Sequence, residues 1–452
     1  MEKLKPGRIK LNKGMPILNF HAAGIDIGDT EHEVAYCDSE GSLQVQNFGT
    51  FTEDLHAIVK VLKLNHVTTV AIEATGVYYV PLFLMLEEAG LKPVLVNAKH
   101  TKNVTGRKKD DTDAGWIQKL HSCGLLQPSF QPNEEDRILR DFVRSRKKLI
   151  SLNSDVIRRI QKSLELMNIK IHTVIRDIVG LTGMTILKAI LQGERNPEVL
   201  AKMRDRRIKA SEEEIVKSLT GIWKPHHLFL LQQALNEYEF RITQIKECEL
   251  QISNQLLKMI AKIKEGDISE VNEAMHEKKK KARPAKNQFN ESIRPLLKAL
   301  IGVDCCDIPG VQEITILEFI SETGTDLTKW ETSKQFSAWL NLAPNTKRSG
   351  GKEISTKMMK KKNIAGIALR AAASTLHSNK SFLGEYYRKM RYKQGGRGAV
   401  IAMAHKLSRI LYSMIKDKTE FKFELAIKDQ EKAKASKIKQ LERQIEKLKN
   451  AS

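Results

Sequence analysis

AAGIDIGDTEHEVAYCDSEGSLQVQNF, residues 22–48, contains three short segments of alternating apolar and polar residues, divided by turn residues. The segments AAGIDIG (22–28), EHEVAYC (31–37) and SLQVQNF (42–48) have the length and composition of strands. Asp29 and Thr30 form the first turn signal, and Ser39-Glu40-Gly41 forms the second. The stretch therefore predicts three consecutive β-strands.

The chain continues to about Pro128 with alternating helical and extended patterns. Helical spacing occurs in DLHAIVKVLK and VPLFLMLEEAG, and strand patterns occur in VTTVAIEA and KPVLVNA. DDTDAGWIQKLH (110–121) predicts an amphipathic helix with an acidic first turn, where the helix dipole favours negative charge. Three strands followed by alternating helices and strands are typical of a ribonuclease-H-like α/β sheet.

Heptad-spaced apolar residues in the middle of the chain predict two long helices. One covers residues 131–170, and a cleaner heptad pattern runs from Leu231 to Met259. Shorter helices with Gly and Pro breaks are expected between them, in 171–228. The spacing leaves open whether the two long helices pair with each other or with another chain.

These patterns divide the chain into five segments that combine α/β and all-α structure. The charged, proline-containing HEKKKKARPAKNQ (276–288) predicts a linker before a compact helical domain. The predicted segments are a basic arm (1–20), a ribonuclease-H-like domain (21–130), a helical coiled-coil region with an insertion (131–290), a C-terminal helical domain (291–416) and a charged helical tail (417–452).

The composition predicts a protein that binds a polyanion. The 452 residues include 76 Lys and Arg against 54 Asp and Glu, which gives a formal net charge of +22. Such a surplus is usually retained where phosphates neutralise it, so DNA or RNA is the expected partner and an anionic membrane surface is the weaker alternative. No segment approaches the roughly 18 apolar residues needed to span a bilayer.

The sequence further predicts a cytoplasmic location. The basic N-terminus lacks the apolar core of a secretory signal. The five cysteines form no CxxC pair, so neither a disulfide framework nor a zinc site is indicated.

Four acidic residues are candidates for a metal-binding catalytic cluster. Asp26 lies on the first predicted strand, and Glu73 lies at the C-terminal end of the fourth. Asp110 and Asp113 are three residues apart at a predicted helix start, which places both on one face. Strand ends in a sheet of this type are where catalytic groups converge.

Such a cluster would be too repulsive to persist without protons or cations. Carboxylate oxygens select Mg²⁺ or Mn²⁺. Two such ions, roughly 3.5–4 Å apart, can stabilise the attacking and leaving oxygens of a phosphodiester displacement. Taken singly, such acidic residues are more often turn residues or helix caps than catalytic groups, and Asp29 and Asp111 are spare carboxylates nearby.

A serine before two glycines is the candidate nucleophile. LNLAPNTKRSGGKEIS places Ser349 before Gly350 and Gly351, and the neighbouring cations are Lys347, Arg348 and Lys352. Glycines allow a phosphate backbone to approach closely, and the cations would bind it and ease ionisation of the hydroxyl. Taken alone, SGG in a basic loop is more typical of a flexible linker. The basic runs TKMMKKKN (356–363) and RYKQGGRG (391–398) favour phosphate contact by the same domain.

The motifs resemble those of the DEDD transposases of insertion sequences, which are related to Piv-type DNA invertases and known as bridge-RNA-guided serine recombinases. The resemblance covers two separated blocks. The first block comprises GIDIGDTEHEVAYCD, AIEATGVYYVPLFLMLEEAGLKPVLVNA and KKDDTDAGWIQKL. The second comprises IPGVQEITILEFISETG, FSAWLNLAPNTKRSGGKEIS and IALRAAA.

The resemblance implies a RuvC-like nuclease domain and a C-terminal transposase domain that together mobilise an insertion sequence. Asp26, Glu73, Asp110 and Asp113 would bind Mg²⁺, and Ser349 would form a covalent link to a DNA strand. The implied partners are donor and target DNA and a structured non-coding guide RNA. The implied assembly is a homo-oligomer, either a dimer or a synaptic tetramer, in which two subunits build a composite site. The implied location is the nucleoid of a prokaryotic cell. The implied nucleic-acid contacts are Lys108, Lys109, Lys347, Arg348, Gly350, Gly351, Lys352 and Arg370.

Two alternative functions account for part of these features. A junction-resolving nuclease would use only the carboxylates and hydrolyse DNA with water. A non-catalytic RNA-binding scaffold would use the charge and the long helices alone.

Overall fold

The computed structural model describes residues 16–73, 76–97, 112–265, 287–344, 347–350, 352–355 and 362–422, together with 438 and 442. The chain forms two compact units, 1–131 and 132–452. In the described part, no helix is both long and apolar enough to cross a membrane.

Unit 1 contains the predicted mixed sheet. Its strands β1 (Ala22–Ile27), β2 (Glu31–Cys37), β3 (Leu43–Gly49), β4 (Thr69–Glu73) and β5 (Lys92–Val96) are arranged in the order β3-β2-β1-β4-β5. The first three strands are antiparallel, and β1, β4 and β5 run parallel. The helices of this unit are α1 (Thr52–Leu64), α2 (Tyr79–Glu88) and α4 (Asp113–Ser122). Unit 1 therefore has the α/β, ribonuclease-H-like fold that the sequence predicted.

Side-chain alternation gives the sheet two different faces. Ala23, Ile25 and Ile27 of β1 join one apolar core with residues of α1 and α2. Ala71 of β4 and Val96 of β5 belong instead to a second, smaller core with Trp116 and Ile117 of α4. Because successive residues of a strand point to opposite faces, the even-numbered residues of β1 lie on the α4 side.

Gly24 permits α4 to pack directly on β1. A Cβ atom at this position would lie 2.2 Å from the backbone nitrogen of Gln118 and 2.5 Å from the carbonyl oxygen of Ala114. The buried Gln118 amide also donates hydrogen bonds to the carbonyl of Ala22 (3.2 Å) and to Ser122 Oγ (3.1 Å). The backbone of helix α4 thus packs directly against β1, the central strand of the sheet.

We expect Gly24→Ala to destabilise unit 1 by about 3 kcal/mol, since a rigid backbone clash cannot be relieved by a rotamer change. Amide hydrogen exchange in α4 and β1, followed by mass spectrometry of the full chain, would report the loss locally. Gly396→Ala is the control, because an added Cβ there meets nothing within 4 Å. Unchanged protection of α4 in the Gly24 variant would contradict the close packing.

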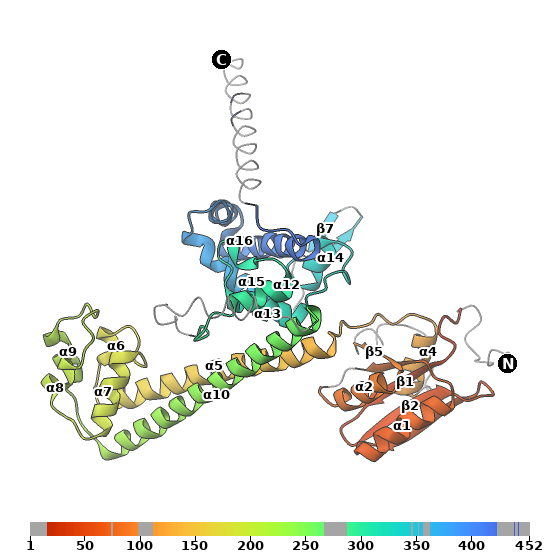
Figure 1. Ribbon diagram of the computed structural model, residues 1–452, viewed down its shortest axis with the longest axis horizontal. Coiled ribbons are helices and arrows are strands. Elements are labelled where there is room, and N and C mark those ends of the chain that lie inside the picture. The colour runs from red at the N-terminus through yellow and green to blue at the C-terminus, as the bar shows by residue number, and fades with distance from the viewer. Residues whose placement is uncertain are drawn as a thin grey trace. The chain divides into compact units, whose positions relative to one another are not determined.

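Unit 2 is built on two long helices, α5 (Glu134–Leu166) and α10 (Pro225–Ile263), which lie side by side (Figure 1). Their contacts pair Glu135 with Lys262, Arg146 with Glu249 and Arg159 with Glu237. Because residue numbers rise on one helix as they fall on the other, the pair is antiparallel. The heptad spacing left open whether each long helix packs against the other or against another chain. In the structure the two helices pack against each other within one chain.

Four short helices connect the far ends of α5 and α10. They are α6 (Ile171–Val174), α7 (Leu181–Leu191), α8 (Pro197–Lys202) and α9 (Glu212–Leu219). Their apolar residues form one core with Ile160 of α5 and Leu231 of α10. The short helices predicted between the long ones are therefore present as a packed helical tip.

The C-terminal part of unit 2 is mostly helical. Its elements are α12 (Arg294–Ile301), α13 (Glu313–Thr323), α14 (Ser333–Trp339), β6 (Lys347–Ser349), β7 (Lys352–Ser355), α15 (Ile364–Thr375) and α16 (Phe382–Asp417), with short 3-10 turns η1 (Cys305–Asp307) and η2 (Leu376–Ser378). Phe319 and Phe336 are among its largest fully buried side chains. Gly310 takes a φ of +83° beside Leu376, so the Pro309-Gly310 turn packs against η2.

The end of α13 joins the start of α5 through ion pairs and hydrogen bonds around the buried Glu322. Arg140 donates hydrogen bonds to the carbonyls of Ser321 (3.1 Å) and Glu322 (2.9 Å), and Arg144 pairs with the Glu322 carboxylate at 2.8 Å. Asp136 is only 5% exposed, and burial raises the pKa of its carboxyl to about 6 although Lys329 and Arg140 lower it.

We expect the stability of unit 2 to fall as the pH rises from about 4 to about 6 because of Asp136. Its carboxyl binds a proton more tightly in the folded chain than in the unfolded chain, so ionisation favours unfolding. At about 1.36 kcal/mol per pKa unit, the penalty reaches about 3 kcal/mol at neutral pH. Asp136→Asn should raise the urea midpoint at neutral pH, with no gain at pH 4.

Asp326→Asn is the contrasting control. Hydrogen bonds from Thr328 lower the pKa of the Asp326 carboxyl, so this group stabilises the fold when ionised. Removing it should lower the midpoint at neutral pH. A pH-independent effect of Asp136→Asn would show that burial does not disfavour its charge.

Candidate active site

Two predicted acidic residues lie side by side at the ends of adjacent parallel strands. The register of β1 and β4 pairs Gly24 with Ala71 and Ile25 with Ile72, so Asp26 and Glu73 occupy the next position. Alternation places Asp26 with Gly24, and Glu73 with Ala71, on the face covered by α4. The fold therefore presents both carboxylates at the carboxyl edge of the sheet.

The N-terminus of α4 lies near the same carboxyl edge of the sheet. Asp113 is the first residue of α4, and Thr112 caps the helix by accepting a hydrogen bond from the Gly115 N–H. Close packing at Gly24 fixes where this helix end lies on the sheet.

Glu33 is a further carboxylate of this site that the sequence analysis missed. It lies directly opposite Asp26 in the β1–β2 register, and its Oε2 accepts a hydrogen bond of 2.8 Å from the Ala114 N–H. The negative charge of Glu33 thus stabilises the positive end of the α4 dipole and ties that end to β2. The turn between the first two strands could have indicated Glu33, because the turn fixes the register that pairs Glu33 with Asp26.

The proximity of these carboxylates shifts the pKa of Asp26. Burial, followed by the like charges of Glu73, Asp113 and Glu33, raises the pKa of the Asp26 carboxyl above its ordinary value. Three acidic groups from three elements therefore act on Asp26 electrostatically, and two of them were predicted. A divalent cation would offset the repulsion between these ionised carboxylates.

Asp110 lies outside the described residues, as do Lys108 and Lys109. The helix begins at Asp113 rather than at Asp110, because Thr112 has an extended backbone and caps it. The predicted start of this helix at Asp110 is therefore wrong, while the approach of Asp110 to Asp113 stays a prediction.

The carboxylates suit a hard divalent cation by their chemistry. Among the described residues, no three His, Cys, Asp or Glu side chains form a group that could hold a metal ion as placed. However, the charges of Glu73, Asp113 and Glu33 all act on Asp26, and carboxylate oxygens are the ligands that Mg²⁺ and Mn²⁺ prefer. The residues present therefore fit such an ion, with the predicted fourth ligand outside the described part.

Ser349 lies at the tip of a β-hairpin in unit 2. Strands β6 and β7 are antiparallel and pair Ser349 with Lys352 across the turn. Gly350 has a φ of +55°, a left-handed conformation that glycine adopts without strain, and Ser349 is exposed. Ser349 and Gly350 therefore belong to a β-hairpin, where the SGG motif taken alone favoured a flexible linker.

The structure describes most of the other predicted nucleic-acid contacts in unit 2. The backbones of Lys347, Arg348 and Lys352 belong to this hairpin, while Gly351 lies outside the described residues. Arg370 lies on α15, is partly buried and donates a hydrogen bond to the Gly366 carbonyl (3.2 Å). The carboxylates belong to unit 1 and the serine to unit 2.

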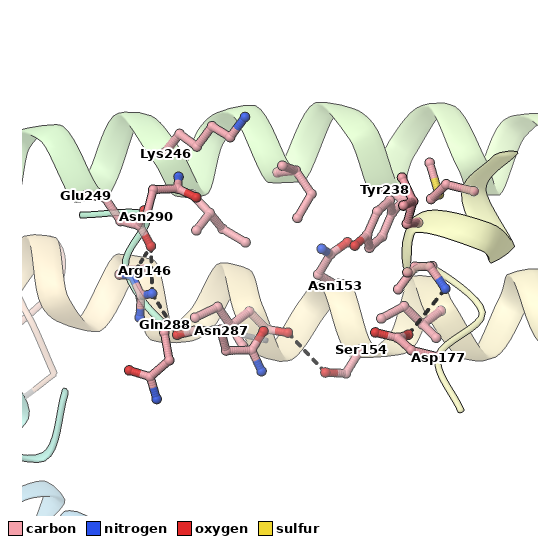
Figure 2. A pocket seen from close by; sticks show the side chains of 18 of the residues that line it. Arg146, Asn153, Ser154, Asp177, Tyr238, Lys246, Glu249, Asn287, Gln288 and Asn290 are labelled. Carbon is pink, nitrogen blue, oxygen red and sulfur yellow. Dashed lines mark hydrogen bonds and ion pairs between the residues drawn. The ribbon is translucent and has the colours of Figure 1, made fainter. Parts of the chain in front are cut away.

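A cavity of about 620 Å³ with both polar and apolar lining residues lies between α5, α10 and the start of α7 (Figure 2). Arg146 borders it and forms a buried pair with Glu249 at 2.6 Å, while Asn153 contributes a buried Oδ1 without a hydrogen-bond partner among the described residues. Among the described residues, none of the predicted site residues lines this cavity.

Two family models of transposases match the chain. The model for DEDD-type transposases of IS110, described as Transposase, matches residues 23–169, which include Asp26, Glu73 and Asp113. The model described as Transposase IS116/IS110/IS902 family matches residues 305–388, which include Ser349. The described carboxylates thus fall inside the first matched segment, and Ser349 falls inside the second.

A curated relative points the same way. The transposase for insertion sequence element IS1111A of Coxiella burnetii (strain RSA 493 / Nine Mile phase I) is 22% identical over 249 residues. The match covers 53% of this chain and 64% of the relative, so the chain spans less than two thirds of that relative's length.

Proposed function

We propose that this chain, which belongs to the IS110 family of insertion-sequence transposases, cleaves and rejoins DNA strands in order to move an insertion sequence. The observation that carries the proposal is the meeting of Asp26 and Glu73 at the ends of adjacent parallel strands, with Asp113 close enough to perturb Asp26. A net charge of +22 supports a nucleic acid as the substrate.

In this proposal Asp26, Glu73, Asp113 and Asp110 hold Mg²⁺ or Mn²⁺, with two ions in each site. Such ions stabilise the charge on the attacking and leaving oxygens of a phosphodiester. Glu33 holds α4 in place through the Ala114 N–H, and therefore orients Asp113 toward the strand ends. The role of the protein is to keep these acidic groups together despite their repulsion.

Ser349 is the proposed nucleophile. Its Oγ forms a bond to the phosphorus of one strand, the P–O bond to the neighbouring deoxyribose breaks, and that oxygen takes up a proton while the serine hydroxyl loses one. Rejoining reverses these bond changes with a different strand, so no energy source is required. The exposed position at a hairpin tip supports access to a phosphate of a DNA duplex.

The proposed partners are donor DNA, target DNA and a structured guide RNA, and the proposed assembly is a homo-oligomer. A composite site, with carboxylates from one subunit and Ser349 from another, is compatible with the location of these groups in different units. Guidance by RNA rests on the family resemblance and on the positive charge of the chain.

The test is a strand-transfer assay with purified protein, the DNA ends of the element, target DNA and the non-coding RNA transcribed beside the gene. Joined products that require Mg²⁺ or Mn²⁺ would support the proposal. Metal-dependent cutting without joining would select the junction-resolving nuclease instead. Binding of RNA and DNA without any cutting would select the scaffold.

A further inference from the structure

The first half of α16 forms a basic projection. Gly395 interrupts the helix with φ +73° and ψ +177°, which are not helical values. In a straight helix Tyr386 and Lys406 would be about 30 Å apart. Instead the Lys406 ammonium lies 4.5 Å from the centre of the Tyr386 ring and 5.7 Å from that of Phe382. The helix therefore folds back on itself, and its bend lies near Gly395.

The bend carries cations and almost nothing to neutralise them. Residues 391–397 are all exposed, and α16 has no acidic residue between Glu385 and Asp417. The cations of the bend are Lys389, Arg391, Lys393 and Arg397. No ion pair joins any of these four to another described residue, whereas Arg388 is engaged with the carbonyls of His377 and Asn379.

An aromatic residue, Tyr392, stands between two of these cations in the sequence, Arg391 and Lys393. Tyr392 is 94% exposed, the highest value among the large hydrophobic side chains that the described residues expose. A tyrosine so placed contributes nothing to a core. A flat ring between cations is the arrangement that binds single-stranded nucleic acid, because the ring stacks on an unpaired base while the cations contact the flanking phosphates.

We infer that the bend of α16, residues 388–397, binds a single-stranded segment of nucleic acid by stacking an unpaired base on Tyr392. The ligand is defined by this chemistry, and it is either a loop of the RNA or a displaced DNA strand. A duplex offers only its phosphates to the same surface, because its bases are already stacked on each other. The inference rests on the proposed function for the kind of ligand, but it does not require cleavage.

The experiment compares binding of the full chain to a labelled RNA of roughly 12 nucleotides, to the DNA strand of the same sequence and to the DNA duplex. Tyr392→Ala should weaken binding to at least one single strand about tenfold, and leave duplex binding within about twofold. Tyr392→Phe keeps the ring and should bind as the wild type does. Phe240→Ala, at an aromatic residue that is 64% exposed on α10, is the matched control and should change nothing.

Each outcome has a defined meaning. Loss on RNA alone or on DNA alone identifies the source of the strand, and loss on both supports stacking on either. Unchanged binding of both single strands by Tyr392→Ala, or an equal loss on the duplex, would overturn the inference. Replacing Arg391 and Lys393 by glutamine should also reduce the salt dependence of single-strand binding, by about 0.7 in log–log slope for each phosphate that the protein no longer neutralises. Absence of strand transfer by the wild type would count against the proposed function alone.

Discussion

Asp26→Asn should lower strand cleavage by about 10³-fold or more while making the metal-free protein more resistant to unfolding. The two effects have one cause. Burial, and then the like charges of Glu73, Asp113 and Glu33, raise the pKa of the Asp26 carboxyl, so its charge destabilises the metal-free fold. Asparagine removes that repulsion. It also removes a ligand, and several kcal/mol of transition-state stabilisation by a metal ion correspond to at least three powers of ten in rate.

Magnesium should separate the two effects in thermal unfolding. An ion that binds only the folded wild type raises its midpoint with concentration, whereas the Asn variant should begin higher and respond less. Asp29→Asn is the matched control, because Asp29 is an exposed acidic residue in the turn after β1. Its activity should stay within about twofold of the wild type. Cleavage by Asp26→Asn at the wild-type rate would remove the carboxylate from the mechanism.

Much of unit 1 could be predicted because local patterns determine it. Alternation identified the five strands, and their ends placed Asp26 and Glu73 at one edge. Glu33 was missed because its position depends on the register across the turn rather than on spacing along a strand. The start of α4 was misplaced because two acidic residues looked like a first turn. Thr112, whose side chain accepts the Gly115 N–H, was the stronger signal.

Unit 2 shows where local patterns stop being informative. Heptads describe one face of a helix and are the same whether its partner is internal or external. The antiparallel pairing of α5 and α10 depends on the packed helices between them and on pairs such as Arg146 with Glu249, which are 103 residues apart. The fold-back of α16 was likewise hidden, since RYKQGGRG indicated positive charge and phosphate contact but not an interrupted helix.

Ser349→Ala should abolish joined products, with a loss of about 10³-fold or more, while RNA and DNA binding stay intact. The substitution removes only the exposed hydroxyl from a hairpin tip, so the fold should not change. A covalent protein–DNA adduct should form with the wild type and be missing from the variant on a denaturing gel. Ser355→Ala, at the other end of the same hairpin, is the matched control. Unchanged recombination by Ser349→Ala would exclude the serine as nucleophile.

Mixing the Asp26→Asn and Ser349→Ala chains tests how the site is assembled. If each site combines unit 1 of one subunit with unit 2 of another, a mixed dimer contains one site with both defects and one site with neither. Adduct formation should then return in the mixture, although neither variant forms it alone. If both groups come from the same subunit, every site in the mixture carries one defect and no adduct should appear. Because the two variants remove groups from different units, the result depends on subunit arrangement and not on the strength of either substitution.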